Sequence, residues 1–101
     1  MLTSKERAEL RAQANTIETT LIVGKDGVTE NVVAEADRLL TARELVKGKV
    51  LENSLLSARE ACEQLAEICK AQQVQSIGSK FVLYKRNETD PKIELPNVSN
   101  Y

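Results

Sequence analysis

The tetrapeptide Gly24-Lys25-Asp26-Gly27 joins a strand-like segment to a helix-like segment, and it constrains the fold more than any other feature. Residues 20–23 before it read Thr-Leu-Ile-Val, a composition typical of a buried strand. Thr29 after it is a good helix N-cap, and Glu30 is placed to complement the helix dipole. A strand that turns directly into a helix through two glycines indicates an α/β domain.

This connection has two interpretations. The first turn of a helix presents N–H groups without intrahelical partners and carries partial positive charge, so a phosphate can bind there. Gly24 and Gly27 carry no Cβ that would hold a ligand away, and Lys25 adds a mobile cation. Alternatively, the segment is a tight turn that needs glycine only for its backbone conformation. The G-x-x-G pattern alone does not decide between them.

Composition indicates one soluble domain. The chain has 101 residues, of which 42% are hydrophobic and 29% charged, as in globular proteins. No apolar run approaches the ~20 residues that span a bilayer, and the polar stretch 1–6 does not resemble a signal peptide. We therefore expect a cytoplasmic protein without a membrane partner. The net charge of −1 means that nucleic-acid binding would depend on a local basic patch.

The residues that most often perform catalysis or hold metals are scarce. The chain has no histidine, and Gly24-Lys25-Asp26 does not fit the P-loop pattern. Cys62 and Cys69 fall in one predicted helix about 10.5 Å apart, too far for a disulfide, and no C-x-x-C motif supports zinc. We interpret both cysteines as small core residues. No catalytic residue, metal or cofactor is expected, and the protein is predicted not to be an enzyme.

Three helices are predicted from capping signals and apolar periodicity. Thr3 and Glu6 form a capping box for a helix that continues to about residue 14, and Ser57 and Glu60 form another for a helix over 57–71. A helix over 29–42 follows the glycine loop. Its apolar stripe comprises Val28, Val32, Ala36, Leu39 and Leu40, and the stripe of the last helix comprises Ala58, Ala61, Cys62, Leu65, Ile68 and Cys69.

Four strands are predicted at residues 20–23, 44–51, 74–77 and 80–85, with Gly78-Ser79 as a hairpin turn. In the second strand, Lys47 and Lys49 alternate with valines, so one face of the sheet should be packed and the other partly wet. The order α-β-α-β-α-β-β predicts a compact α/β domain with a mixed four-stranded sheet packed by helices.

The domain is expected to cover residues 1–88. Residues 89–101 would form a C-terminal extension, in which 93–95 could add an edge segment before a frayed end. Phe81 and Tyr84 should point to opposite faces of their strand, and Tyr84 is the better candidate for a surface role because its hydroxyl needs a partner.

Several segments resemble the CRM domain, also called the YhbY-like RNA-binding family. They are Leu21–Glu30, Glu44–Val50, Val74–Gly78 leading to Phe81–Arg86, and Lys92–Pro96, in this order along the chain. The resemblance spans roughly residues 2–96. Together these segments are far more specific than the G-x-x-G pattern alone.

The resemblance implies a fold similar to the C-terminal domain of bacterial translation initiation factor three. It also implies RNA as the partner, because stand-alone bacterial members are associated with precursors of the large ribosomal subunit and plant organelle relatives take part in group II intron splicing. The family's GxxG loop is compared with that of KH domains, which holds the nucleic-acid backbone. Gly24, Lys25 and Gly27 match this loop, and Thr29 caps the helix behind it.

The predicted function is therefore RNA binding that assists ribosome assembly, by a monomer acting alone or with ribosomal proteins. The predicted RNA-binding residues are Gly24, Lys25, Asp26, Gly27 and Thr29, extended by Lys47, Lys49, Lys80, Lys85, Arg86, Arg7 and Arg11. The alternative is a protein-binding adaptor that docks through an acidic face of the last helix, formed by Glu60, Glu63 and Glu67.

Overall fold

Side-chain caps determine where the helices begin in the computed structural model, which describes residues 3–86. The Glu6 N–H donates to Thr3 Oγ1 at 3.1 Å, and the Thr3 N–H donates to Glu6 Oε1 at 2.9 Å. Ser57 and Glu60 exchange the same two bonds, at 3.1 and 3.0 Å. Both predicted capping boxes are confirmed, and each satisfies two N–H groups that a helix start leaves without partners.

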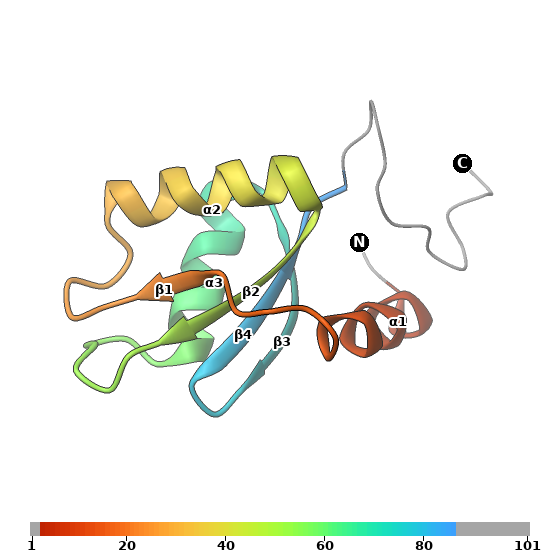
Figure 1. The fold of residues 1–101 in the computed structure, drawn as a ribbon, viewed down its shortest axis with the longest axis horizontal. Coiled ribbons are helices and arrows are strands. Elements are labelled where there is room, and N and C mark those ends of the chain that lie inside the picture. Colours follow the sequence, from red (N-terminus) through yellow and green to blue (C-terminus); the bar gives the residue numbers. More distant parts are fainter. Residues whose placement is uncertain (1–2, 87–101) are drawn as a thin grey trace.

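The predicted order of elements is also confirmed (Figure 1). The elements are α1 (Ser4–Ala14), β1 (Leu21–Val23), α2 (Glu30–Arg43), β2 (Leu45–Val50), α3 (Ala58–Cys69), β3 (Gln72–Ile77) and β4 (Lys80–Tyr84).

The four strands form one mixed sheet in the order β1-β2-β4-β3. β1 and β2 are parallel, as a strand–helix–strand crossover through α2 requires, while the β2–β4 and β3–β4 pairs are antiparallel. The β3–β4 hairpin turns at Gly78, whose φ of 59° is a left-handed conformation that glycine adopts without strain. The mixed four-stranded sheet and the hairpin turn are as predicted.

Helices α2 and α3 cover one face of the sheet and form the main core with it (Figure 1). Cys62 and Cys69 are buried in this core with free thiols, which confirms their interpretation as small core residues. Phe81 packs across its neighbour Gly48, where a Cβ would lie only 2.3 Å from the ring. The glycine in β2 therefore makes room for the one buried phenylalanine.

Helix α1 covers only one end of the opposite face. A second core cluster joins it to the sheet and comprises Leu10, Ala14, Leu45, Val74, Val82 and Tyr84. Lys47 is half-buried at the margin of α1, and its Nζ donates to the Ala14 carbonyl at 3.3 Å. Lys49, two residues along β2, is exposed. The predicted face that is partly wet is thus confirmed, with a dry end under α1 and an open end beyond it.

Some predictions need correction. Phe81 and Tyr84 do point to opposite faces, but the surface role predicted for Tyr84 is wrong, because its side chain is buried beneath α1 with only 3% of its surface exposed. Ile68 is not a core residue and is 54% exposed. Helix α3 ends at Cys69 because Lys70 takes a left-handed conformation, with φ 58°.

The predicted domain boundary at 88 and the extension 89–101, including the edge segment at 93–95, lie outside the described residues. Within residues 3–86, none of the helices has the length and apolar character needed to cross a bilayer.

Candidate nucleic-acid interface

The glycine loop is a closed turn that leads directly into the first turn of α2. The Gly27 N–H donates to the Gly24 carbonyl at 3.0 Å, and the Thr29 N–H donates to the Gly27 carbonyl at 3.1 Å. Thr29 is the N-cap of α2, and its Oγ1 accepts from the Val32 N–H at 3.2 Å. By helix geometry the N–H groups of residues 30 and 31 have no carbonyl four residues earlier within the helix, so they are available to an anion.

The two glycines of the loop have different structural roles. Gly27 has φ 71°, and a Cβ there would lie 3.3 Å from the side chain of Leu56, so the turn itself requires glycine. Gly24 has no positive φ, and a Cβ there would make only an ordinary contact of 3.9 Å with Leu51. The fold therefore explains Gly27 and leaves the absence of a side chain at Gly24 without a structural reason.

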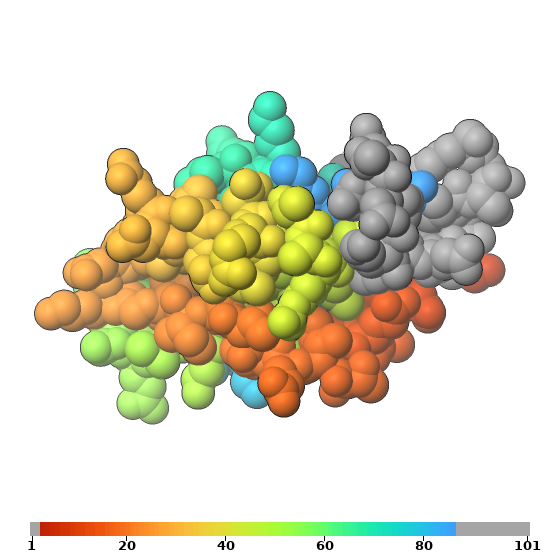
Figure 2. Space-filling view, turned by 45° about the horizontal axis from the view of Figure 1, so that its top comes forward, coloured from red at the N-terminus to blue at the C-terminus, as the bar shows by residue number. Residues whose placement is uncertain are grey.

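Three connections meet at the end of the sheet where the glycine loop lies. The Leu51 N–H, just after β2, donates to the Val23 carbonyl at the end of β1 at 2.9 Å. The Val50 N–H donates to the carbonyl of Ser79 in the β3–β4 turn at 2.7 Å. The glycine loop and the β2–α3 connection lie side by side at this end of the molecule (Figures 1 and 2). We call this region, residues 24–29, 49–57 and 77–80, the loop end.

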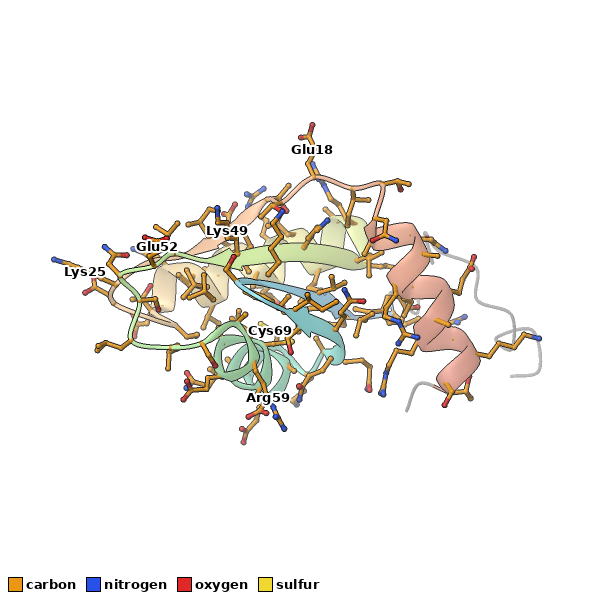
Figure 3. All side chains as sticks on the ribbon, turned by 90° about the horizontal axis from the view of Figure 1, so that it is seen from below. Glu18, Lys25, Lys49, Glu52, Arg59 and Cys69 are labelled. Carbon is orange, nitrogen blue, oxygen red and sulfur yellow. The ribbon has the colours of Figure 1, made fainter. Side chains whose placement is uncertain are left out.

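Three of the predicted basic contacts belong to the loop end. Lys25 is exposed in the glycine loop, and Lys49 and Lys80 are exposed and directly opposite each other on β2 and β4. Lys25 and Lys49 lie toward the end of the molecule that is opposite α1 (Figure 3). The structure thus brings together residues that are far apart in the sequence.

The other predicted basic contacts lie elsewhere. The register pairs Leu45 with Tyr84 at the opposite end of the β2–β4 ladder, so Lys85 and Arg86 leave the sheet far from the loop end. Arg7 and Arg11 are on α1, which covers that same distant part of the sheet. Lys47 lies between the two regions, at the margin of α1. The single basic track predicted from the sequence is therefore divided by the fold.

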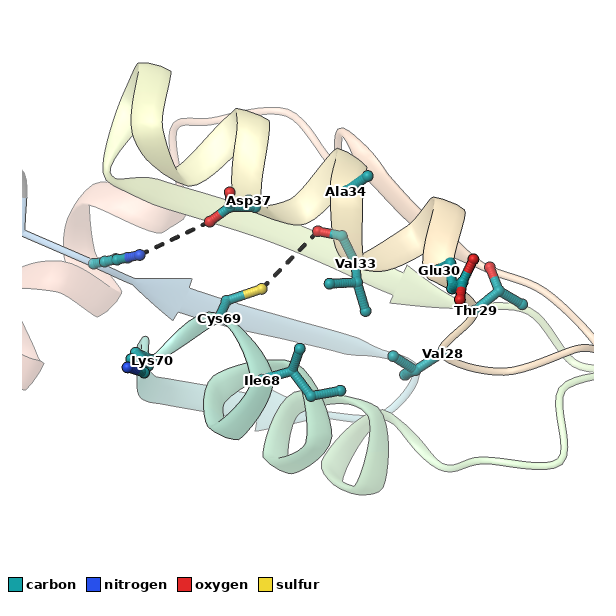
Figure 4. Close-up of a pocket in the computed structure, with 10 residues that line it drawn as sticks. Val28, Thr29, Glu30, Val33, Ala34, Asp37, Ile68, Cys69 and Lys70 are labelled. Atoms are coloured by element: carbon teal, nitrogen blue, oxygen red, sulfur yellow. Dashed lines mark hydrogen bonds and ion pairs between the residues drawn. The ribbon is translucent and has the colours of Figure 1, made fainter.

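A groove of about 600 Å³ separates α2 from α3 (Figure 4). Val28, Val33 and Ile68 contribute apolar side chains to it, so it is mainly a hydrophobic depression. Lys85 also lines the groove, but its Nζ lies 3.8 Å from Asp37 Oδ1. This ion pair partly neutralises one of the cations predicted to contact RNA.

The two thiols are poor nucleophiles. Burial, with a smaller effect from nearby Glu63, raises the pKa of Cys62 to about 11, and its Sγ donates to the Val82 carbonyl at 3.8 Å. Burial also raises the pKa of Cys69. Both groups therefore stay protonated at neutral pH. Among residues 3–86, no group of three or more histidine, cysteine or acidic side chains is placed to hold a metal ion.

The acidic face of α3 is exposed as predicted, but two of its three members already have partners. Glu60 Oε1 accepts from the Ser57 N–H in the capping box, and this hydrogen bond lowers the pKa of Glu60. Glu63 Oε1 accepts from Arg59 Nε at 3.1 Å. These two carboxylates thus stabilise α3 itself, which explains their presence without a binding partner.

Sequence reasoning missed the apolar side chains that surround the glycine loop. Ile22, Leu51 and Leu55 are exposed, with 47%, 39% and 90% of their surfaces accessible. The alternation in β1 could have indicated Ile22, since it lies between two buried residues. Leu51 ends the predicted strand 44–51, whose alternation places it on the partly wet face, whereas Leu55 falls in a connection without a periodic pattern and could not be identified.

Comparison with known proteins agrees with this fold. The family model of the CRS1 / YhbY (CRM) domain matches residues 2–85. The probable RNA-binding protein YqeI of Bacillus subtilis is 38% identical over 96 residues, which are 95% of this chain and 100% of that protein. An RNA-binding protein of Haemophilus influenzae is 34% identical, covering 94% of this chain and 95% of its own length.

Among solved structures, the solution structure of a hypothetical protein from Staphylococcus aureus matches with a TM-score of 0.80 and 38% identity, over 95% of this chain and 100% of that one. Sequence and architecture therefore agree across nearly the full length. The chain belongs to the CRS1 / YhbY (CRM) domain family.

Proposed function

We propose that this protein binds RNA through the loop end, with a phosphate of the RNA backbone at the N-terminus of α2. The N–H groups of the first turn, the dipole of α2 and the ammonium of Lys25 would together hold the phosphate. The observation that carries this proposal is Gly24, because the fold gives no reason for its missing side chain, whereas close approach of a ligand backbone does.

The RNA we propose is ribosomal RNA or a precursor of the large ribosomal subunit, bound in the cytoplasm to assist its assembly. Support comes from the family resemblance and from relatives named as RNA-binding proteins. Contacts to the phosphate backbone position an RNA without reading its sequence, so specificity would come from RNA shape or from neighbouring ribosomal proteins. We propose that the protein acts as a monomer, by binding and without catalysis.

A protein-binding adaptor that uses the acidic face of α3 is less well supported. Glu60 and Glu63 are engaged within the helix, and only Glu67 of the three has no hydrogen bond or ion pair within residues 3–86. Charge reversal at Glu63 and Glu67 separates the two ideas. It would abolish association with ribosomal particles if the adaptor is correct and would change little if RNA is bound at the loop end.

The test of the proposed function is charge reversal of Lys25. Lys25→Glu should weaken binding to fragments of large-subunit ribosomal RNA at least about tenfold, because a charge-assisted bond to phosphate is replaced by repulsion. Lys5→Glu is the matched control, since Lys5 is an exposed residue of α1 and undergoes the same change of charge. Fluorescence anisotropy at two salt concentrations measures the affinity. Equal affinity of the Lys25→Glu variant and the wild type would refute the proposal.

An amide-shift titration by NMR locates the surface directly. Shifts that are centred on residues 24–30 and decrease with salt would support the proposal. Shifts confined to α3 would contradict it and favour the adaptor.

A further inference from the structure

One row of exposed side chains crosses all four strands next to the glycine loop. The register pairs Ile22 with Lys49, Lys49 with Lys80, and Lys80 with Ile77. Paired residues point to the same face of a sheet, so these four side chains share the face that carries α1, at the end that α1 leaves uncovered. Four strands spaced about 4.8 Å apart give the row a length of about 14 Å. We call these four residues the open row.

The two lysines at the centre of the open row repel each other. The bond from the Val50 N–H to the Ser79 carbonyl marks a hydrogen-bonded position, so the adjacent Lys49–Lys80 pair occupies a non-hydrogen-bonded position, where side chains are closer. Like charges directly opposite each other destabilise a sheet. In the part of the chain that the structure describes, neither lysine has an ion-pair partner. An anion between them would remove this cost.

The two ends of the open row are apolar and exposed. Ile22 is 47% accessible and Ile77 is 65% accessible, although isoleucine is usually buried in folded proteins. The nearby exposed acids, Asp26 and Glu52, belong to the flanking connections and not to the row. The row therefore has two positive charges at its centre and an apolar side chain at each end. Such a surface suits a ligand that offers both anionic groups and flat apolar surfaces.

We infer that the open row binds an unpaired segment of RNA that continues from the glycine loop, with Lys49 and Lys80 on its phosphates and Ile22 and Ile77 against its riboses or bases. This inference rests on the proposed function, because the glycine loop sets where the RNA enters. Ile22 is two residues before Gly24 on the same strand and loop, so the two surfaces are continuous.

The apolar ends of the row select single-stranded RNA over a duplex. In a duplex the bases are paired and stacked inside, and the protein meets mainly phosphates and hydroxyl groups. An unpaired segment can turn its bases toward an isoleucine side chain and cover it. The binding should be tolerant of sequence, because both aromatic residues within 3–86, Phe81 and Tyr84, are buried and cannot stack on bases.

The experiment compares three variants on two RNAs. The RNAs are an unstructured single strand of about twelve nucleotides and a hairpin whose double-stranded stem contains the same sequence paired with its complement. The variants are Lys25→Glu in the loop, the pair Lys49→Gln and Lys80→Gln, and the pair Ile22→Thr and Ile77→Thr. Threonine keeps a β-branched side chain, so the strands should be retained. The control pair is Lys5→Gln with Lys70→Asn, which removes two exposed lysines outside the row.

We expect the wild type to prefer the single strand. The lysine pair should lower its affinity for the single strand and flatten the slope of log K against log salt by about 1.4, since each lost phosphate contact is worth about 0.7. The isoleucine pair should lower affinity about threefold or more with the slope unchanged, because the lost contact is apolar. The control pair should have little effect on either quantity.

Two results would overturn the inference while leaving the proposed function intact. One is equal affinity for the single strand and the duplex. The other is loss of binding in Lys25→Glu without loss in either pair of row variants. If Lys25→Glu itself binds RNA as tightly as the wild type, the proposed function fails, and the inference that depends on it fails as well.

Discussion

The face of the sheet that carries α1 has two ends with opposite character. Under α1, Leu10 and Tyr84 belong to a dry cluster in which every large side chain is at least nine-tenths buried. At the loop end, the same strands expose Lys49, Lys80 and Ile77 to solvent. The register of β2 with β4 is continuous between the two ends, and the pairing of β3 with β4 shifts once, between Gln73 and Gln75. The two ends thus share one sheet, and they differ because α1 packs over only one of them.

This comparison separates residues that stabilise the fold from residues that are free for binding. An apolar side chain in the covered end contributes to stability through burial, and truncating it should destabilise the protein. A side chain in the open row contributes little to stability, so it can be chosen for a ligand. The predictions below test this division, in order of decreasing effect on the free energy of unfolding.

The largest effect is expected from Leu10→Ala. The side chain of Leu10 is wholly buried between α1 and the sheet, so its truncation leaves a cavity in the smaller core cluster. We expect a loss of about 2–5 kcal/mol in the free energy of unfolding, measured by urea denaturation. Ile77→Ala, an apolar truncation in the open row, is the control and should change stability by less than about 0.5 kcal/mol. Equal losses in the two variants would contradict the division.

A smaller effect is expected within the glycine loop itself. Gly27→Ala places a side chain at φ 71° and against Leu56, and should cost about 1–2 kcal/mol. Gly24→Ala should leave stability nearly unchanged, because its Cβ meets only an ordinary contact with Leu51. Under the proposed function, Gly24→Ala should nevertheless weaken RNA binding. Thermal unfolding and anisotropy on the same samples measure both quantities. A large loss of stability in Gly24→Ala would show that the turn itself needs this glycine, and Gly24 would then no longer support the proposed function.

The sequence predicted local structure better than the relation between distant segments. Thr29, the two capping boxes and the Gly78 turn were predictable because each depends on side chains within three or four residues. The burial of Tyr84 was not, because it depends on α1 folding back over β4, and Tyr84 lies 70 residues after Ala14, the last residue of α1. Ile68 was misassigned for a related reason, since the width of the stripe that α3 buries depends on how closely α2 packs beside it.

The candidate site followed the same rule. Gly24, Lys25 and Thr29 are contiguous, and the sequence identified them as one unit. Lys80 and Lys85 stand at opposite ends of the predicted strand 80–85, but which of them lies near the glycine loop could not be predicted without the strand order. The sheet order β1-β2-β4-β3 is what selects the basic residues that lie near the loop.

The smallest effect on stability is expected from a charge reversal in the open row. It is the most specific test of the row, because the variant should gain stability and lose affinity for RNA. Lys80→Glu places a carboxylate directly opposite Lys49, so a repulsive cross-strand pair becomes an attractive one. The protein should gain about 0.2–1 kcal/mol in stability. The gain should shrink at 1 M salt, where the screening length is about 3 Å. Under the proposed function, the same variant should bind single-stranded RNA more weakly.

A double-mutant cycle isolates the interaction between the two positions. Lys49→Glu alone should stabilise the protein in the same way, whereas the double variant with Lys49→Glu and Lys80→Glu should lose the gain because two carboxylates then face each other. Urea midpoints for the four proteins at low and high salt give the coupling energy. Additive effects would mean that the two lysines do not interact, and the argument that an anion relieves their repulsion would fail. The opposite result has two parts: a coupling energy that disappears at high salt, and weaker RNA binding in each single variant. Together they would show that the two lysines lower the stability of the sheet and increase its affinity for RNA.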